Sequence, residues 1–350
     1  MKHRITAICL VGVIIFSCIT INCNAGELCL SAKSAVLMEA DSKDILFEKN
    51  SAEILPMAST TKIMTALVVL ERCRIDQSFT VDERAVGTEG TSAYLQTGDV
   101  MTVEAALYAL LLQSANDAAN ALALEVSKSI DDFAALMNEK ARALGLENTC
   151  FKNPSGLPED GHHTTAAELA YLAAVCLENE TFYKIVSTKS ATVRIGGKDR
   201  TFTNHNKLLS LYDGAVGVKT GFTKESGRCL VGAAERNGVR LITVTLSASS
   251  DWSDHTRLFD LGFETYKSYM LCTSEDFIVS LKSSDGRVLL SPREAVRITL
   301  KKGAKISTRI EATSTVFPST QKDLPIAFAV FYSNEKELCR VPLYLRTSYA

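Results

Sequence analysis

Three short motifs, widely separated along the 350-residue chain, constrain its fold most strongly. Their side chains can cooperate only if the fold brings them into one cleft. In chain order they are Ser59-Thr-Thr-Lys62, Ser114-Ala-Asn116 and Lys219-Thr-Gly221. Each motif alone is a common chance pattern. Together, in this order, they supply a hydroxyl, an amide and two amines, which are the parts of a serine acyl-transfer site.

The first motif predicts a nucleophile and its base. Residues three apart on a helix share a face, so Lys62 is expected beside Ser59. A serine hydroxyl becomes a good nucleophile only when a base within hydrogen-bond reach takes its proton. An amine is such a base when it is neutral, and burial near a second cation such as Lys219 lowers its pKa. We therefore expect Ser59 to attack and Lys62 to accept the proton.

The second motif is expected to complete the catalytic group. The hydroxyl of Ser114 can relay a proton between Lys62 and a leaving amine, and Asn116 can hold a substrate amide while it steadies Lys62. The backbone N–H of Ser59 should face the oxyanion of a tetrahedral intermediate, with the N–H of Phe222 as the second donor.

The third motif is expected to bind substrate. Lys219 and Thr220 offer a charge and a hydroxyl to a substrate carboxylate. Gly221 leaves room for an extended peptide along the strand edge, in the manner of an added β-strand. Phe222 follows directly, and its backbone N–H is the second oxyanion donor named above. The predicted substrate-binding residues are therefore Lys219, Thr220, Gly221 and Phe222.

Local patterns predict a mixed α/β (α+β) chain. An apolar–polar alternation predicts a hairpin over residues 34–40 and 45–47, and Asn237-Gly238 predicts a tight turn between two strands. Thr165, followed by Glu168, forms a capping box at a helix start. That helix is expected to run to about residue 177. Further helices are expected over residues 63–70, 103–112, 118–126 and 132–144. Ser59 should stand at the start of the first of these, and residues 114–116 in the turn before the third.

The chain divides into three predicted segments. Residues 1–25 begin with a basic head, continue with an apolar stretch and end in small residues up to Ala25. This pattern indicates a secretory signal peptide that is cleaved after Ala25. Residues 26–269 form the predicted catalytic domain. Beyond residue 270, short alternating runs separated by turn residues predict a small all-β C-terminal domain. Removal of the signal would leave an exported, extracytoplasmic protein.

Two alternatives for the leader remain open. Its apolar stretch, residues 5–21, is at the short limit for spanning a membrane as an uncleaved anchor. Lipidation at Cys18 or Cys23 is a weaker option, because Phe16 and Asn22 stand where small residues are needed.

Charge and cysteine content exclude several classes. The net charge of −2, without a basic stripe, argues against a nucleic-acid partner. Seven of the ten cysteines follow the leader, irregularly spaced and without Cys-x-x-Cys, which favours buried free thiols. His162 and His163 are adjacent and lack a partner at metal-ligand spacing, so a turn is expected there. Neither a metal nor another cofactor is expected.

Longer stretches around the motifs resemble one family, the serine-type D-alanyl-D-alanine carboxypeptidases or low-molecular-mass penicillin-binding proteins. The similarity covers about residues 30–268 well and the β-rich tail more loosely, and it is clearest in residues 55–67, 113–119, 151–158, 219–223 and 229–232. It implies a β-lactamase/transpeptidase-like domain, with an antiparallel sheet flanked by helices, and a small C-terminal all-β domain.

The resemblance also implies an activity. Ser59 would be the acylated nucleophile, Lys62 the base, Ser114 and Asn116 the proton relay and positioner, and Lys219 the carboxylate-recognising residue. The substrate would be the pentapeptide stem of peptidoglycan, which would lose its terminal D-alanine. β-Lactams would acylate the same serine as covalent inhibitors.

The chain departs from the family pattern in two places. Relatives often carry Arg-Phe-x-Asp after the last sheet strands, where the arginine helps to grip the terminal carboxylate. The corresponding stretch here is Asp251-Trp-Ser-Asp254, which leaves that role to Thr220 or Arg257. Many relatives also end in an amphipathic helix on the membrane. The sequence ending at Ala350 shows none, so no C-terminal membrane anchor is expected.

Three other functions stay open on the sequence. A β-lactamase needs a carboxylate that activates water, for which Glu159 or Glu168 could be proposed, although the capping box already explains Glu168. A catalytically weak penicillin-sensing or wall-binding module would keep the same motifs. An endopeptidase that cuts cross-links would use the same site.

Overall fold

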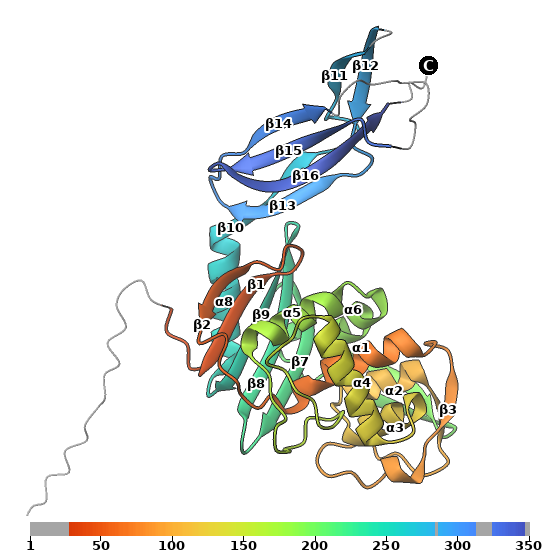
Figure 1. Cartoon of the computed structure of the whole chain (residues 1–350). Helices are drawn as coiled ribbons and strands as arrows, with labels where there is room; N and C mark the ends of the chain where they lie inside the picture. Colours follow the sequence, from red (N-terminus) through yellow and green to blue (C-terminus); the bar gives the residue numbers. More distant parts are fainter. Residues whose placement is uncertain (1–27, 284–285, 313–323, 347–350) are drawn as a thin grey trace, which may run out of the picture.

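The computed structural model describes residues 28–283, 286–312 and 324–346. The larger part of the molecule is built on a five-stranded antiparallel sheet in the order β2-β1-β9-β8-β7 (Figure 1). Its strands are β1 Ser34–Glu39, β2 Ile45–Lys49, β7 Ala215–Thr223, β8 Gly227–Arg236 and β9 Val239–Ala248. The first strands therefore pair with the last ones of this part, and β7 lies at the sheet edge.

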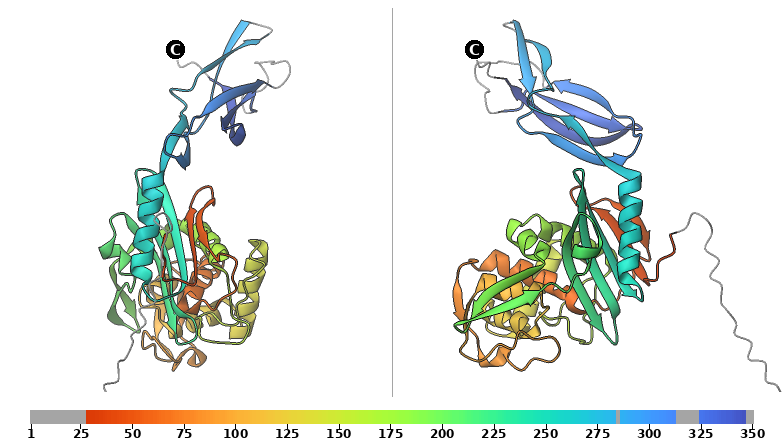
Figure 2. Two further views of the ribbon diagram at one scale, coloured as in Figure 1. Left: turned by 90° about the vertical axis from the view of Figure 1, so that its left-hand side faces the viewer. Right: turned by 180° about the vertical axis from the view of Figure 1, so that it is seen from behind.

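Helices cover both faces of this sheet (Figures 1 and 2). α8 packs on one face together with the short α7, while α5 and α6 lie against the other face, and α1 to α4 gather beyond them. The helices are η1 Ala58–Thr61, α1 Lys62–Arg72, η2 Glu83–Ala85, α2 Val103–Leu111, α3 Asn116–Val126, α4 Ile130–Ala143, α5 Ala166–Leu177, α6 Glu180–Ser187, α7 Leu208–Leu211 and α8 Asp251–Thr265.

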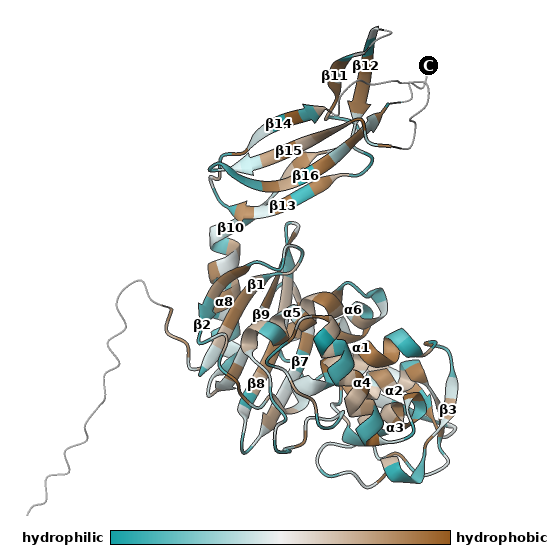
Figure 3. Ribbon diagram, in the orientation of Figure 1, coloured by the Kyte–Doolittle hydropathy of each residue, from teal (hydrophilic) through white to brown (hydrophobic). Residues whose placement is uncertain are grey.

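Side-chain alternation explains why the sheet is buried on both sides. In β1, Val36 and Met38 join the core beneath the helical cluster, whereas Ala35 and Leu37 join a second core beneath α8. Successive residues of a strand point to opposite faces, so all six residues of β1 are buried. Figure 3 shows the hydrophobic colouring along β1 and β9.

The predicted hairpins are confirmed. β1 pairs with β2, and β8 pairs with β9 through Asn237 and Gly238, whose φ angles are 52° and 72°. Positive φ at both central residues is what a two-residue turn of type I′ requires. Two short antiparallel strand pairs flank the helical cluster: β3 Ser78–Thr80 with β4 Val100–Thr102, and the hairpin of β5 Ser190–Ile195 with β6 Lys198–Thr203.

The C-terminal part is rich in β-strands, as predicted, and has its own apolar core. It lies beyond the end of α8, away from the helical cluster (Figures 1 and 2). Its strands are β10 Tyr266–Cys272, β11 Val279–Ser283, β12 Gly286–Ser291, β13 Val296–Lys301, β14 Ser307–Ala312, β15 Ala327–Ser333 and β16 Lys336–Leu345. β10 pairs with β13, and the other five strands form a sheet in the order β11-β12-β16-β15-β14. The fold class expected from the sequence is thus confirmed.

Three local predictions differ from the structure in detail. Ser59 lies in the 3₁₀ turn η1, and the α-helix begins only at Lys62. Asn116 is the first residue of α3, not part of the preceding turn. Thr165 caps α5 as expected, but Glu168 bonds to the backbone N–H of Asn148 instead of closing the capping box.

The cysteine prediction is wrong at one position. Cys29 is disulfide-bonded. Among the described residues, six other cysteines are free thiols, and three of these, Cys176, Cys229 and Cys272, are buried. Burial raises the pKa of the Cys229 thiol, which keeps it protonated and unreactive.

The predicted signal peptide lies outside the described residues, as does the end of the chain after residue 346. Within the described ranges, no helix combines the length and the apolar character needed to cross a bilayer.

Candidate active site

Ser59 and Lys62 meet as the spacing predicts. The Lys62 Nζ lies 3.0 Å from the Ser59 Oγ, 2.7 Å from the Asn116 Oδ1 and 2.5 Å from the carbonyl oxygen of Ser155. The amide and carbonyl oxygens can only accept hydrogen bonds, whereas a serine hydroxyl can also donate. A neutral Lys62 can therefore donate its two N–H groups to those oxygens and accept the Ser59 proton on its lone pair.

The surroundings favour that neutral form. Lys62 is fully buried, and its pKa lies well below the ordinary lysine value. Desolvation is the main cause, and the charge of Lys219 adds to it, while the carboxylate of Asp117 works in the opposite direction. A lysine with a lowered pKa next to a hydroxyl is suited to act as a general base near neutral pH.

Ser114 and Asn116 lie at the junction of α2 and α3, next to Ser59 and Lys62. Ser114 is buried and has a φ of +63°, a conformation that costs a non-glycine residue energy and recurs at functional sites. Asn116 is clamped by two bonds to one loop: its N–H donates to the Thr91 carbonyl at 2.7 Å and its Nδ2 donates to the Glu89 carbonyl at 2.6 Å. The clamp leaves the Asn116 Oδ1 directed at Lys62.

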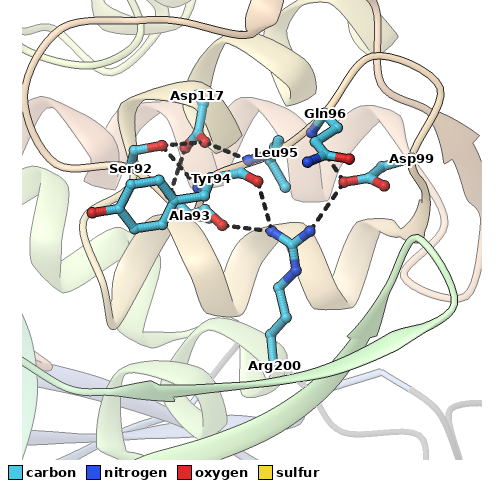
Figure 4. A network of polar contacts seen from close by, with 8 residues as sticks. All are labelled: Ser92, Ala93, Tyr94, Leu95, Gln96, Asp99, Asp117 and Arg200. Atoms are coloured by element: carbon cyan, nitrogen blue, oxygen red, sulfur yellow. Dashed lines mark hydrogen bonds and ion pairs between the residues drawn. The ribbon is translucent and has the colours of Figure 1, made fainter.

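A polar network holds that loop in place (Figure 4). The buried carboxylate of Asp117 accepts hydrogen bonds from the Ser92 hydroxyl and from the N–H groups of Ala93 and Leu95. From the other side, Arg200 of β6 donates to the carbonyls of Ala93 and Tyr94 and pairs with Asp99. Two separate elements thus fix the loop that positions Asn116.

The edge strand β7 closes the site from the opposite side. Lys219 is buried, and desolvation lowers its pKa to about 7. Its Nζ donates to the Thr220 carbonyl at 2.9 Å. A Cβ on Gly221 would lie 3.0 Å from the Ser59 N and 3.2 Å from the Met57 carbonyl oxygen, so any side chain there would push the strand away from the serine.

A cavity of about 690 Å³ opens above these groups. Ser59, Ser114, Thr220, Gly221 and Phe222 line it directly, whereas Lys62, Asn116 and Lys219 are buried next to these lining residues. All eight residues predicted for the site therefore gather at one cavity between β7 and the helical cluster.

The sequence of residues 22–250 matches the family described as D-alanyl-D-alanine carboxypeptidase, peptidase family S11. The chain belongs to this family of serine peptidases.

Individual relatives agree with that assignment. The carboxypeptidase is similar to D-alanyl-D-alanine carboxypeptidase DacF of Bacillus subtilis, with 33% identity over 91% of this chain and 85% of the relative. Penicillin-binding protein 5 from Haemophilus influenzae superposes with a TM-score of 0.75 at 25% identity, covering 92% of this chain and 98% of that one. The Streptomyces K15 DD-transpeptidase has a TM-score of 0.64 at 34% identity, over 67% and 98% of the two chains.

The two carboxylates considered for a β-lactamase lie elsewhere. Glu159 accepts a hydrogen bond from the Asn153 side chain, and Glu168 holds the backbone of Asn148 and the hydroxyl of Thr149. Among the described residues, neither lines the catalytic cavity. Glu168 therefore has a structural partner, though not the one that the capping box predicted.

His162 supports the serine turn from below. Its Nδ1 accepts from the Lys152 N–H at 3.0 Å, so the Nε2 carries the proton and donates to the Thr61 Oγ1 at 2.7 Å. The Thr61 hydroxyl in turn donates to the Ala58 carbonyl. Burial lowers the pKa of His162 to about 4, which keeps the ring neutral. His162 ends the turn that was expected there, since its N–H donates to the Glu159 carbonyl at 3.0 Å, and it is a buried structural residue of the carboxypeptidase.

Arg257, proposed from the sequence as a carboxylate grip, is wrong for that role. It donates to the Cys29 carbonyl and does not line the cavity. The cavity is also lined by residues to which the sequence had given no role: Thr91, Thr203, Asn204, His205, Lys207, Arg228, Asp251 and Trp252. No sequence motif identifies Arg228, because its partner Asp251 lies at the start of α8 and contacts it only in the folded chain.

Proposed function

We propose that this carboxypeptidase removes the terminal D-alanine from peptidoglycan stem pentapeptides through an acyl-enzyme on Ser59. The contact between the Lys62 Nζ and the Ser59 Oγ, at 3.0 Å, carries this proposal. It supplies the base that serine acylation requires, in a site where burial keeps that base neutral part of the time.

Acylation moves one proton and exchanges one bond. The Ser59 Oγ attacks the carbonyl carbon between the two D-alanines while Lys62 takes the hydroxyl proton. Collapse of the tetrahedral intermediate breaks the C–N bond, and the leaving amine receives a proton from Lys62 through the hydroxyl of Ser114. Free D-alanine departs, and Ser59 is left as an ester of the shortened peptide.

Two backbone donors are proposed to stabilise the oxyanion. The Ser59 N–H is one, and the N–H of Phe222 is the other. The close approach of β7, where even a Cβ at Gly221 would lie 3.0 Å from the Ser59 N, supports this pairing. Removal of one such donor typically costs about 2.7–4 kcal/mol of transition-state stabilisation.

Deacylation regenerates the free enzyme. Water attacks the ester, and Lys62 again serves as the base with Asn116 holding it in place. The positions of Glu159 and Glu168 away from the cavity argue against a carboxylate that would speed this step, so a β-lactam should stay bound to Ser59 much longer than a β-lactamase would allow.

The terminal carboxylate of the substrate should lie near Thr220 and Lys219. Thr220 lines the cavity with its side chain half-buried, and Lys219 provides positive charge from below. This placement sets the D-Ala–D-Ala bond over Ser59 and makes the enzyme a carboxypeptidase.

We also propose that residues 1–25 direct export and that the catalytic domain acts outside the cytoplasm. The predicted boundary after residue 269 falls inside β10, Tyr266–Cys272, which pairs with β13. We therefore propose that the C-terminal domain begins at Tyr266, directly after α8.

The test uses the purified protein and diacetyl-Lys-D-Ala-D-Ala, with released D-alanine as the readout. Wild type should release D-alanine, and Ser59→Ala should not. A penicillin-sensing module would bind benzylpenicillin at Ser59 without releasing D-alanine, and an endopeptidase would act faster on a cross-linked dimer. The proposal fails if wild type releases no D-alanine and carries no penicillin adduct at Ser59.

A further inference from the structure

Arg228 lies on the strand next to β7, on the same sheet face as the substrate-binding hydroxyl. In the β7–β8 register it stands opposite Phe222, two positions along from the partner of Thr220. Residues directly opposite share a face, and diagonal neighbours on that face lie about 7–8 Å apart, within reach of a long side chain. The Arg228 side chain can therefore reach the space in front of Thr220, and both residues line the catalytic cavity.

Asp251 holds one edge of this guanidinium. The Arg228 Nε donates to the Asp251 Oδ1 at 2.9 Å, and the same carboxylate oxygen accepts from the Trp252 N–H at 3.0 Å. The Arg228 guanidinium also lies over the Trp252 ring, 5.7 Å from its centre. Because Asp251 is nearly completely buried, the anchor is rigid while the arginine stays partly exposed.

The other edge of Arg228 is free. Within the described part of the chain, neither terminal NH₂ group makes a hydrogen bond. Four N–H donors of a fixed planar cation therefore remain for a ligand in the cavity that contains Ser59. A carboxylate is the group that matches this donor pattern, because its two oxygens accept from two parallel N–H groups.

We propose that Arg228, anchored by Asp251, binds the terminal carboxylate of the substrate together with Thr220 and determines the selectivity for free C-terminal acids. This inference rests on the proposed function, since it assigns the carboxylate contact of that reaction.

Arginine brings a property that Lys219 lacks. The pKa of Lys219 is about 7, so the protonated fraction of Lys219 in the free enzyme decreases above neutral pH. Its Nζ also donates to the Thr220 carbonyl. A guanidinium keeps its charge at every physiological pH.

The test compares diacetyl-Lys-D-Ala-D-Ala with its C-terminal carboxamide. Wild type should prefer the free acid. Arg228→Gln should lower kcat/KM for the acid by about 10- to 100-fold and for the carboxamide by less than about threefold, because only the acid loses a charged hydrogen-bond pair. Arg228→Lys should recover only part of the preference, since an ammonium cannot form the bidentate contact.

Two further variants keep the experiment decisive. Arg228→Gln combined with Asp251→Asn avoids leaving an unpaired buried carboxylate, and its preference should match that of Arg228→Gln. Arg257→Gln removes an arginine of α8 that bonds to Cys29 outside the cavity, and it should retain the wild-type preference.

A binding readout is independent of turnover. Trp252 is the one tryptophan of the sequence and lines the cavity, so its fluorescence should report peptide binding to the Ser59→Ala protein. The acid should bind more tightly than the carboxamide, and this difference should vanish when Arg228→Gln is added.

Equal preference in wild type and both Arg228→Gln variants would overturn the role of Arg228. That result would leave D-alanine release, and hence the proposed function, intact. Absence of release by wild type would instead overturn the proposed function.

Discussion

Lys62 and Lys219 are almost completely buried around the same cavity, and the pKa of Lys62 is lowered first by desolvation and further by the charge of Lys219. Two amines in one apolar site cannot both stay protonated at low cost, because each is desolvated and each repels the other. The pair thus prepares Lys62 for use as a base while Lys219 supplies charge near the substrate. The predictions below depend on this coupling and on the groups that hold it in place.

Lys219→Gln should move the pH dependence of acylation. Loss of the second cation raises the pKa of Lys62, so a larger part of Lys62 is protonated near neutral pH and the acidic limb moves to higher pH. Lys219→Arg keeps a cation and should leave that limb near its wild-type position. The measurement is the rate of benzylpenicillin attachment to Ser59, followed by mass spectrometry over a pH series. Superimposable profiles for wild type and Lys219→Gln would contradict the coupling.

Lys219→Met should stabilise the fold while it weakens substrate turnover. The folded-state pKa of Lys219 is about 7, well below that of an unfolded lysine, so the unfolded chain binds the additional proton between the two values. The penalty of burying Lys219 is therefore greatest below about pH 7 and declines as the pH rises. The gain in unfolding free energy should be on the order of 1–4 kcal/mol in mildly acidic solution.

Thermal unfolding at one acidic and one alkaline pH measures this effect. The increase in Tm for Lys219→Met over wild type should be larger in acid. A variant that is less stable than wild type at both values would show that Lys219 contributes to stability and not only to the site.

Asn116→Asp should disable the base by charge alone. The new carboxylate would stand where an amide oxygen now lies 2.7 Å from the Lys62 Nζ. An opposite charge this close raises an amine's pKa by about 1–3, so acylation near neutral pH should fall by about 10- to 1000-fold and recover at high pH. Asn116→Ala, which removes the amide without adding charge, is the matched control. Identical pH profiles for the two variants would indicate a purely structural role.

Arg200→Ala should slow acylation from a distance. Arg200 donates to the carbonyls of Ala93 and Tyr94, and its loss frees the loop whose backbone clamps Asn116 (Figure 4). Small displacements of catalytic groups cost up to about 100-fold in rate, so a loss of about 10- to 100-fold is expected. Arg194→Ala is the control on the same hairpin, because its pair with Asp199 is exposed and should contribute little.

The rate of penicillin attachment measures both variants. Equal rates for Arg200→Ala and Arg194→Ala would show that the loop keeps its position without the arginine.

The sequence was sufficient for the parts of the site that sit on regular elements. Ser59 and Lys62 share one turn, and Lys219 to Phe222 share one strand, so helical and strand periodicity places their side chains. The hairpin at Asn237-Gly238 was also predictable, because these two turn residues have a local conformational preference. The order of the five strands was not predicted, because β1 pairs with β9, which lies far away in the sequence.

The remaining features depend on tertiary contacts between residues without a motif. The Ser155 carbonyl that accepts a hydrogen bond from Lys62 is a backbone atom, and backbone atoms leave no sequence signal. Arg228 and Asp251 pair because α8 begins over β8, which no local pattern encodes. Glu168 satisfies every rule of a capping box, yet Asn148 and Thr149 compete successfully for its carboxylate.

The most direct test of Lys62 as the base is the rate at which benzylpenicillin acylates Ser59 in wild type and in Lys62→Met, measured by peptide mass spectrometry at neutral pH. Methionine fills the buried space of the lysine without a proton-accepting nitrogen. We expect a single adduct on Ser59 in wild type and a rate lower by about 10²- to 10⁴-fold in the variant, the usual range for a lost general base. An adduct on another residue, or equal rates in the two proteins, would contradict this expectation.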